Sequence, residues 1–304
     1  RAVSYVQVAM AVGIFGLSAF FFSRLFSFYE CWRQLGKYKP SKDLTYFSLP
    51  VAGGNLLHGI LTQLDVLMLG FFVSAEMVGI YALARRIASL MLKASQAFDP
   101  IFSSIVSELT VKKQYVELND RFRVLFRWIL IINLPIFFAL LTIGDVILAF
   151  IGGGAMNALP IYQIERGVTV LLTLCVCMMI QGLFALTDPL LTMAGKPYLN
   201  FFNNIFWLFS NFVINMILIE YFALGIVGAA FGALSSAILV NGLRASQVYY
   251  IFSVSPLGIE QIKPVFAAIL AGLITLLIRE FLKGDVTTAL ISFIAFFISY
   301  LFFL

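Results

Sequence analysis

Long apolar runs alternate with short polar connections along nearly the whole chain. Each run has roughly 20 residues or more, the length that a helix needs to cross the hydrocarbon core of a bilayer. The pattern predicts nine membrane-spanning helices, at residues 4–29, 45–73, 76–106, 124–151, 166–193, 199–222, 224–252, 263–283 and 286–304. We therefore expect an all-α, polytopic transmembrane bundle, because a spanning helix satisfies its backbone groups internally where lipid offers no partners.

The composition agrees with this prediction. Of the 304 residues, 62% are hydrophobic and only 12% are charged, whereas soluble domains carry roughly 25% charged residues. The net charge of +5 comes from Lys and Arg in alternate connections, such as 31–44 and 107–127, while those at 74–75, 152–165 and 220–224 contain neither. The positive-inside rule then predicts that the basic connections and the C-terminus are cytoplasmic, and no nucleic-acid partner is expected.

Two local features predict how the helices are arranged. The polar segment 107–123 has the composition of an amphipathic helix on the inner membrane surface, or of a solvated loop helix. Gly228 and Gly232 form a small-xxx-small pair, which predicts that helix 224–252 packs closely against a neighbour.

Polar side chains form a stripe along helix 45–73, since a helix advances about 100° per residue and these positions project onto one face. Asp65 is the most unusual of them, because a carboxylate near the bilayer centre costs about 2.5–3.5 kcal/mol on insertion scales. The stripe also contains the only histidine of the chain. Its members are Ser48, Asn55, His58, Thr62 and Asp65.

The next helix, 76–106, carries a second stripe with three cations, which must face water, a counter-charge or a ligand. Its members are Arg85, Arg86, Ser89, Lys93, Gln96, Ser103, Ser104 and Ser107, with Asp99 beside them. A third stripe, on helix 199–222, consists of Asn200, Asn204, Trp207, Asn211 and Asn215. Asparagine amides suit sugar hydroxyls because each offers donors and an acceptor. Asn241 and Arg244 lie near the inner end of helix 224–252, from where Arg244 could snorkel to the interface.

Each polar residue alone has a structural interpretation, whereas the three stripes together favour a functional one. Single Asn or Ser residues commonly hydrogen-bond membrane helices to one another, and Asp65 could simply neutralise Arg85 or Arg86. Together, the stripes predict a water-accessible, positively biased cavity for a ligand with phosphate or carboxylate groups, which the planar fork of Arg binds well. His58 could exchange protons with a gradient or be a hydrogen-bonded helix contact.

Motifs for catalysis are missing from the sequence. It contains no phosphate-binding Gly-rich loop, no metal-ligand cluster and no nucleophile–base set. We therefore predict that the protein is not an enzyme and has no cofactor or metal. Transport would use a gradient or a supply of high-energy substrate.

Two segments resemble one family of exporters. Residues 47–90 contain FSLP, the D-x-x-M-L-G that begins at Asp65, and VGIYALARRI. In residues 195–236 a G-K-P turn leads to an Asn-bearing helix and then to a G-I-V-G-A-A helix. The chain resembles the C-terminal portion of polysaccharide (O-antigen type) flippases, which belong to the multidrug/oligosaccharidyl-lipid/polysaccharide exporter superfamily.

This resemblance implies a transporter with two lobes of six helices each. Residues 1–44 would hold the last helix of the N-terminal lobe and a cytoplasmic linker, 45–252 the C-terminal lobe, and 253–304 two appended helices. The first five helices of the transporter would then precede the present sequence. Such proteins flip polyprenyl-diphosphate-linked oligosaccharides from the inner to the outer leaflet of a bacterial or archaeal cytoplasmic membrane by alternating access. Their other partners are the surrounding membrane lipids.

The resemblance also implies roles for the stripes. Substrate would meet the cavity residues Arg85, Arg86, Lys93, Gln96, Asn200, Asn204, Asn211 and Asn215, while Asp65, His58 and Asp99 would couple ions or balance charge. One alternative is an organic-cation or drug antiporter of the same superfamily, which needs an acidic cavity and is disfavoured by the cationic stripe. Another is a non-transporting membrane scaffold that partners a polysaccharide polymerase or a glycosyltransferase.

Overall fold

Helices make up nearly all of the residues that the computed structural model describes, which are 2–25, 41–157, 161–255, 258, 261–282 and 295–300. They are α1 (Ala2–Leu25), α3 (Lys42–Phe72), α4 (Ala75–Ala88), α5 (Met91–Val111), α6 (Tyr115–Asn157), α7 (Ile161–Phe184), α8 (Thr187–Met193), α9 (Pro197–Met216), the π-helical turn η1 (Ile217–Tyr221), α10 (Gly225–Phe252) and α11 (Ile262–Leu282). No strand occurs among these described residues, and the predicted all-α fold class is confirmed.

The chain divides into two compact units, Arg1–Tyr46 and Phe47–Leu304. The first unit contains α1 and the first residues of α3. The described side chains of α1 are exposed, among them Phe15 at 77% and Met10 at 66%. A helix with so much exposed apolar surface needs lipid or protein around it.

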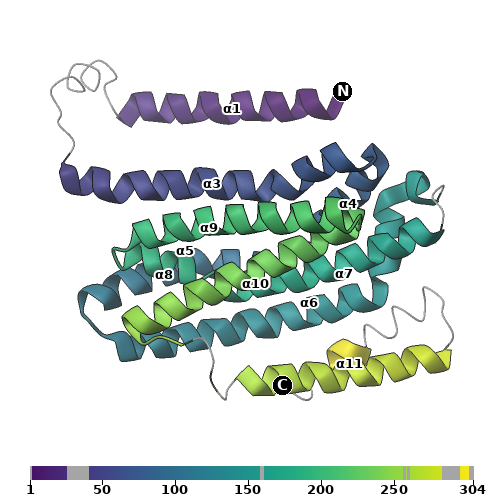
Figure 1. Cartoon of the computed structure of the whole chain (residues 1–304). Helices are drawn as coiled ribbons and strands as arrows, with labels where there is room; N and C mark the ends of the chain where they lie inside the picture. The colour runs from purple at the N-terminus through teal and green to yellow at the C-terminus, as the bar shows by residue number, and fades with distance from the viewer. Residues whose placement is uncertain are drawn as a thin grey trace. The chain divides into compact units, whose positions relative to one another are not determined.

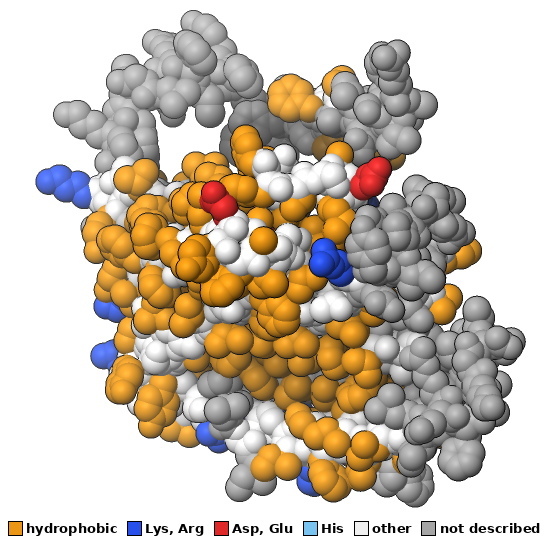
Figure 2. Space-filling view, turned by 45° about the vertical axis from the view of Figure 1, so that its right-hand side comes forward, with side chains coloured by type: hydrophobic (Ala, Val, Ile, Leu, Met, Phe, Trp, Pro, Cys, Tyr) orange, Lys and Arg blue, Asp and Glu red, His pale blue; other side chains and the backbone are white. Residues whose placement is uncertain are grey.

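The second unit is a bundle in which α7 lies centrally and packs against α4, α5, α6 and α10 (Figure 1). One apolar core surrounds Tyr81 and Leu174, and a second surrounds Phe102 and Phe122. Hydrophobic side chains also cover most of the described surface seen in Figure 2. A bundle that is apolar both inside and outside is what a lipid environment selects.

Five helical segments of the described chain are long and apolar enough to cross a membrane. They are Leu44–Phe72, Tyr115–Thr142, Arg166–Met193, Pro197–Tyr221 and Gly225–Phe252. Each overlaps one of the predicted spans.

The predicted spans nearest the two ends of the chain are described less completely. Helices α1 and α11 occupy the predicted spans 4–29 and 263–283, with shorter apolar stretches at Val12–Phe21 and Ile262–Ile274. Of the predicted span 286–304, the structure describes residues 295–300, which are helical.

The prediction of one continuous helix over 76–106 is wrong. The chain turns at Ser89 and Leu90, between α4 and α5. There, the amides of Leu92 and Lys93 donate to carbonyls three residues earlier, at 3.0 and 3.1 Å. Such tight turns shift the helical phase, so residues before and after the break do not share the face that a straight helix would give them.

Two further boundaries differ from the predictions. Segment 107–123 is not a single amphipathic helix, because α5 continues to Val111, and α6 begins at Tyr115 after a turn in which Lys113 has φ +55°. At its other end, α6 extends to Asn157, so residues 152–157 are helical where a connection was expected.

Close packing at the two glycines of α10 is confirmed. A Cβ atom on Gly228 would lie 2.8 Å from the carbonyl oxygen of Leu218, and one on Gly232 would overlap the Asn215 side chain. Both positions therefore let α10 approach α9 and η1 closely.

Candidate functional site

Helix α9 has an inverted amphipathic pattern. Its asparagines at 200, 203, 204, 211 and 215 are all at most 9% exposed, whereas Phe202 and Phe209 are exposed by 62% and 69%. The polar face therefore points into the bundle and the aromatic face away from it. A helix at the surface of a water-soluble protein would have the opposite arrangement. In lipid, the exposed aromatic side chains face the membrane and the amides lie where neighbouring helices can hydrogen-bond them.

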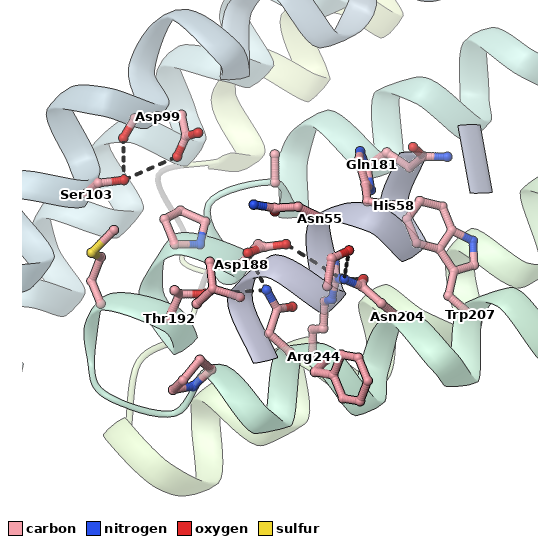
Figure 3. Close-up of a pocket in the computed structure, with 18 of the residues that line it drawn as sticks. Asn55, His58, Asp99, Ser103, Gln181, Asp188, Thr192, Asn204, Trp207 and Arg244 are labelled. Carbon is pink, nitrogen blue, oxygen red and sulfur yellow. Dashed lines mark hydrogen bonds and ion pairs between the residues drawn. The ribbon is translucent and has the colours of Figure 1, made fainter. Parts of the chain in front are cut away.

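The N-terminal part of this polar face lines a pocket of about 430 Å³, within the size range of ligand sites. Residues of α3, α5, α7, α8, α9 and α10 contribute to it (Figure 3). Its polar lining consists largely of amides, namely Asn55, Gln96, Gln181, Asn200, Asn204 and Asn241, together with Ser95, Ser103 and Thr192. The ionisable residues of the lining are His58, Asp99, Asp188 and Arg244.

Arg244 is the cation of this pocket, and its side chain is only 7% exposed. Its Nη2 donates to Asn204 Oδ1 at 2.6 Å, and Asn204 Nδ2 donates in turn to the carbonyl oxygen of Gly54 at 3.1 Å. The guanidinium carbon lies 5.9 Å from the centre of the Trp207 ring, within cation–π distance. The interpretation that Arg244 snorkels to the interface is therefore wrong, because neighbouring helices enclose and bond it.

Asp188 of α8 provides the counter-charge to Arg244. Its Oδ2 lies 3.7 Å from Arg244 Nη2, and its side chain is 43% exposed. Asn200 Nδ2 donates to Asp188 Oδ1, and also to Thr192 Oγ1 at 3.4 Å. The short helix α8 carries Asp188 and begins after a break in the predicted span 166–193, at Ala185 and Leu186.

The other ionisable residues of the pocket interact electrostatically with this pair, His58 with both members and Asp99 with Asp188. Asp99 accepts from Ser103 Oγ at 3.4 Å on α5, at a different side of the pocket from Arg244 (Figure 3). The imidazole ring of His58 lies 5.9 Å from the Trp207 ring. The pocket thus combines an aromatic wall, many amides, two carboxylates and one enclosed guanidinium.

Asp65 lies in a separate, enclosed network. Its side chain is 5% exposed, and its Oδ2 accepts from Arg85 Nη1 at 3.0 Å and from the Tyr81 hydroxyl at 3.2 Å. Its Oδ1 accepts from Asn215 Nδ2 at 2.9 Å, and Asn215 also donates to Asn211 at 3.0 Å. The structure therefore shows an ion pair of Asp65 with Arg85, while ion coupling by Asp65 stays a prediction.

The remaining predicted cavity residues are distributed over different surroundings. Arg86 and Lys93 are exposed, and Lys93 Nζ donates to Gln96 Oε1 at 3.1 Å. Of these three, only Gln96 belongs to the pocket lining drawn from the described residues. The expectation of a positively biased cavity made by Arg85, Arg86 and Lys93 is not met there, since the pocket has two carboxylates and one Arg.

Sequence reasoning underestimated Arg244 and missed Asp188 and Gln181. Asp188 stands before Pro189 within an apolar run, and an Asp-Pro step is a recognisable signal for a helix interruption. Arg244 carried no such signal, because a single Arg near a helix end usually snorkels. Within the described part of the chain, no group of three or more His, Cys, Asp or Glu is placed to hold a metal ion.

Comparison with known proteins agrees with a membrane transporter. Over 216 residues the chain is 27% identical to the probable flippase AglR of Haloferax volcanii, an alignment that covers 70% of this chain and 42% of that protein. The chain thus spans less than half the length of this curated relative.

Solved structures with the same fold are also transporters. An inward-closed structure of the lipid II flippase MurJ matches with a TM-score of 0.63 and 16% identity, covering 91% of this chain and 58% of that one. An outward-facing multidrug resistance MATE family transporter of the MOP superfamily matches with a TM-score of 0.50 and 14% identity, covering 88% and 65%. At such identities the likeness concerns the fold.

A family model decides the assignment. The model described as polysaccharide biosynthesis protein matches residues 2–157, which is just over half of the chain. This is the region that contains the quoted resemblance at 47–90, while the pocket also uses helices beyond it. The chain belongs to the polysaccharide biosynthesis protein family.

Proposed function

We propose that the protein flips a polyprenyl-diphosphate-linked oligosaccharide across the cytoplasmic membrane of a bacterium or archaeon, from the inner to the outer leaflet, by alternating access. Residues 45–252 would form one six-helix lobe, with the C-terminus on the cytoplasmic side. Two findings support this proposal: the chain is related in sequence to a probable flippase, and its family is described as polysaccharide biosynthesis protein. The supply of substrate on one side or an ion gradient would drive the cycle.

The observation that carries the proposal is the chemistry of the pocket. Amides from α3, α5, α7, α9 and α10 surround it, Trp207 offers an aromatic face, and Arg244 adds one enclosed cation. Amides match sugar hydroxyls because they donate and accept, and guanidinium matches phosphate or carboxylate. In this proposal Asn200 and Asn204 meet the glycan, while the exposed Arg86 and Lys93 attract the diphosphate outside the pocket.

A reconstituted flipping assay tests the proposal. The full-length protein is placed in vesicles with a fluorescent polyprenyl-diphosphate oligosaccharide, and exposure of the label to a membrane-impermeant quencher is followed over time. We expect Arg244→Gln to slow exposure by at least about tenfold, because it removes a buried charge that pairs with the ligand. Lys263→Gln is the matched control, since Lys263 is exposed at the start of α11. Equal rates with and without the wild-type protein would contradict the proposal.

The carboxylates of the pocket favour a second candidate function. Asp99 and Asp188 both line it, and two carboxylates suit an organic cation better than a diphosphate. A drug antiporter would move ethidium in the same vesicles and would lose this activity in Asp99→Asn. A scaffold for a polymerase or glycosyltransferase would move neither compound and would copurify with its partner.

A further inference from the structure

The two charges that face each other in the pocket are paired less tightly than their chemistry allows. The Arg244 Nη2 to Asp188 Oδ2 distance is 3.7 Å, whereas charge-assisted N–H···O bonds are usually about 2.7–2.9 Å long. Arg244 Nε is buried without a hydrogen-bond partner among the described residues. The guanidinium therefore has donor capacity that the present contacts leave unused.

The two partners also differ in how firmly they are held. Arg244 lies inside the long helix α10, is 7% exposed and is bonded to Asn204 at 2.6 Å. Asp188 is 43% exposed and lies on α8, between the break at Ala185 and a turn at Gly195 with φ +79°. The carboxylate can thus move into the pocket water at little desolvation cost, while the guanidinium cannot leave its place.

We propose that Asp188 is a built-in competitor anion on Arg244, which an oxyanion of the transported ligand displaces. The incoming oxyanion binds the guanidinium, and Asp188 turns into the pocket water with Asn200 still available as a donor. Arg244 then has a counter-ion both before and after ligand binding, so it is never buried uncompensated. This inference rests on the proposed function only for the identity of the natural ligand.

Asp99 offers a matched control within the same pocket. It is also a carboxylate, but it is bonded to Ser103 on α5 and lies at a different side of the pocket from Arg244 (Figure 3). Removing its charge changes the electrostatic potential of the pocket without freeing Arg244. A comparison of Asp188→Asn with Asp99→Asn therefore separates displacement at Arg244 from a general effect of charge.

Binding of inorganic pyrophosphate to the full-length protein in nanodiscs tests the proposal. The Trp207 ring reports on the site because its centre lies 5.9 Å from the guanidinium carbon of Arg244. Trp32→Phe with Trp128→Phe makes it the sole tryptophan of the 304 residues, and Trp207→Phe in this background identifies its share of the fluorescence of the full-length protein. We expect Asp188→Asn to tighten pyrophosphate binding by about tenfold, a typical coupling between competing groups. Arg244→Gln should abolish binding, and Asp99→Asn, which removes a charge from the pocket without freeing Arg244, should tighten it clearly less than Asp188→Asn. Unchanged or weaker binding in Asp188→Asn, or equal tightening in Asp99→Asn, would overturn the proposal.

Thermal unfolding covers the case in which Asp188→Asn is unstable. Without its counter-ion the buried Arg244 should lower the melting temperature, and pyrophosphate should restore it more than it raises that of the wild type. Absence of this restoration would contradict the exchange. Glucuronate in place of pyrophosphate tells whether a sugar carboxylate or a phosphate is the natural oxyanion, and binding of neither refutes the site. A protein that binds pyrophosphate in this pattern but fails the flipping assay would retain the exchange site and lose only the proposed function.

Discussion

Two Asp–Arg pairs lie in neighbouring parts of the same bundle, and they are built in opposite ways. Asp65 accepts from Arg85, Tyr81 and Asn215, and its side chain is 5% exposed. Asp188 is 43% exposed and stands 3.7 Å from its Arg. The carboxylate of the first pair accepts three hydrogen bonds, while in the second pair Arg244 Nε has no hydrogen-bond partner among the described residues.

The surroundings of the pairs differ in the same sense. The cavity beside Asp65 and Arg85 has a volume of only about 30 Å³, room for about one water molecule. The pocket beside Asp188 and Arg244 has about 430 Å³. Trp207 and Gln181 line both spaces and separate them. From this difference we expect the pair beside open space to take part in ligand binding and the closed pair to hold helices together.

The largest expected effect comes from breaking the closed pair. Arg85→Ala leaves Asp65 buried without its counter-ion and should lower the free energy of unfolding by about 3–5 kcal/mol. Thermal unfolding of the detergent-purified protein measures this. Arg86→Ala is the matched control, since its side chain is exposed on the same turn of α4. We expect the double change Asp65→Asn with Arg85→Gln to recover much of the loss, because it removes both charges together.

Transport data on these variants would sharpen the comparison. If Arg85→Ala kept the wild-type melting temperature while flipping stopped, the closed pair would be functional rather than structural. Loss of flipping in Arg86→Ala with unchanged stability would instead support the exposed cation as a substrate contact.

A moderate effect is expected from crowding the closed network through its neighbour. In Gly232→Ala the new methyl group would meet the Asn215 amide that holds Asp65, and overpacking of this kind costs about 1–3 kcal/mol. Gly242→Ala on the same helix is the control, because a Cβ there meets nothing within 4 Å. Its melting temperature should equal or slightly exceed that of the wild type. Equal behaviour of both variants would show that α10 can move away from α9.

The smallest effect is expected at a third, fully exposed pair outside the membrane spans. Lys112 Nζ donates to Glu108 Oε1 at 2.6 Å, and this bond, with the nearby charge, lowers the pKa of Glu108. A lowered carboxylate pKa adds stability at neutral pH, and this contribution is lost as pH falls through the folded-state pKa. Solvent screens such pairs, so Glu108→Gln should leave the melting temperature unchanged at neutral pH. A clear shift would mean that the α5–α6 turn is more constrained than its exposure suggests.

Much of the fold followed from pattern alone, and the site only in part. The asparagine face of α9 was recognisable because regular spacing on one unbroken helix places its side chains on one side. The stripe from Arg85 to Lys93 was misjudged because the turn at Ser89 and Leu90 separates the two segments. Arg85 turns towards Asp65, while Lys93 is exposed.

Hydropathy and helical periodicity act within one segment, and they were sufficient to indicate a helical membrane bundle with amides facing inward. The pairing of charges depends instead on contacts between different segments of the chain. Asp65 and Asn215 are 150 positions apart, and Arg244 of α10 meets Asp188 of α8 at 3.7 Å. Distance, burial and room for a ligand arise only when the helices pack, because the local sequence carries no information on the partner that a neighbouring helix supplies. For this reason tertiary packing alone distinguishes the closed pair from the exchangeable one.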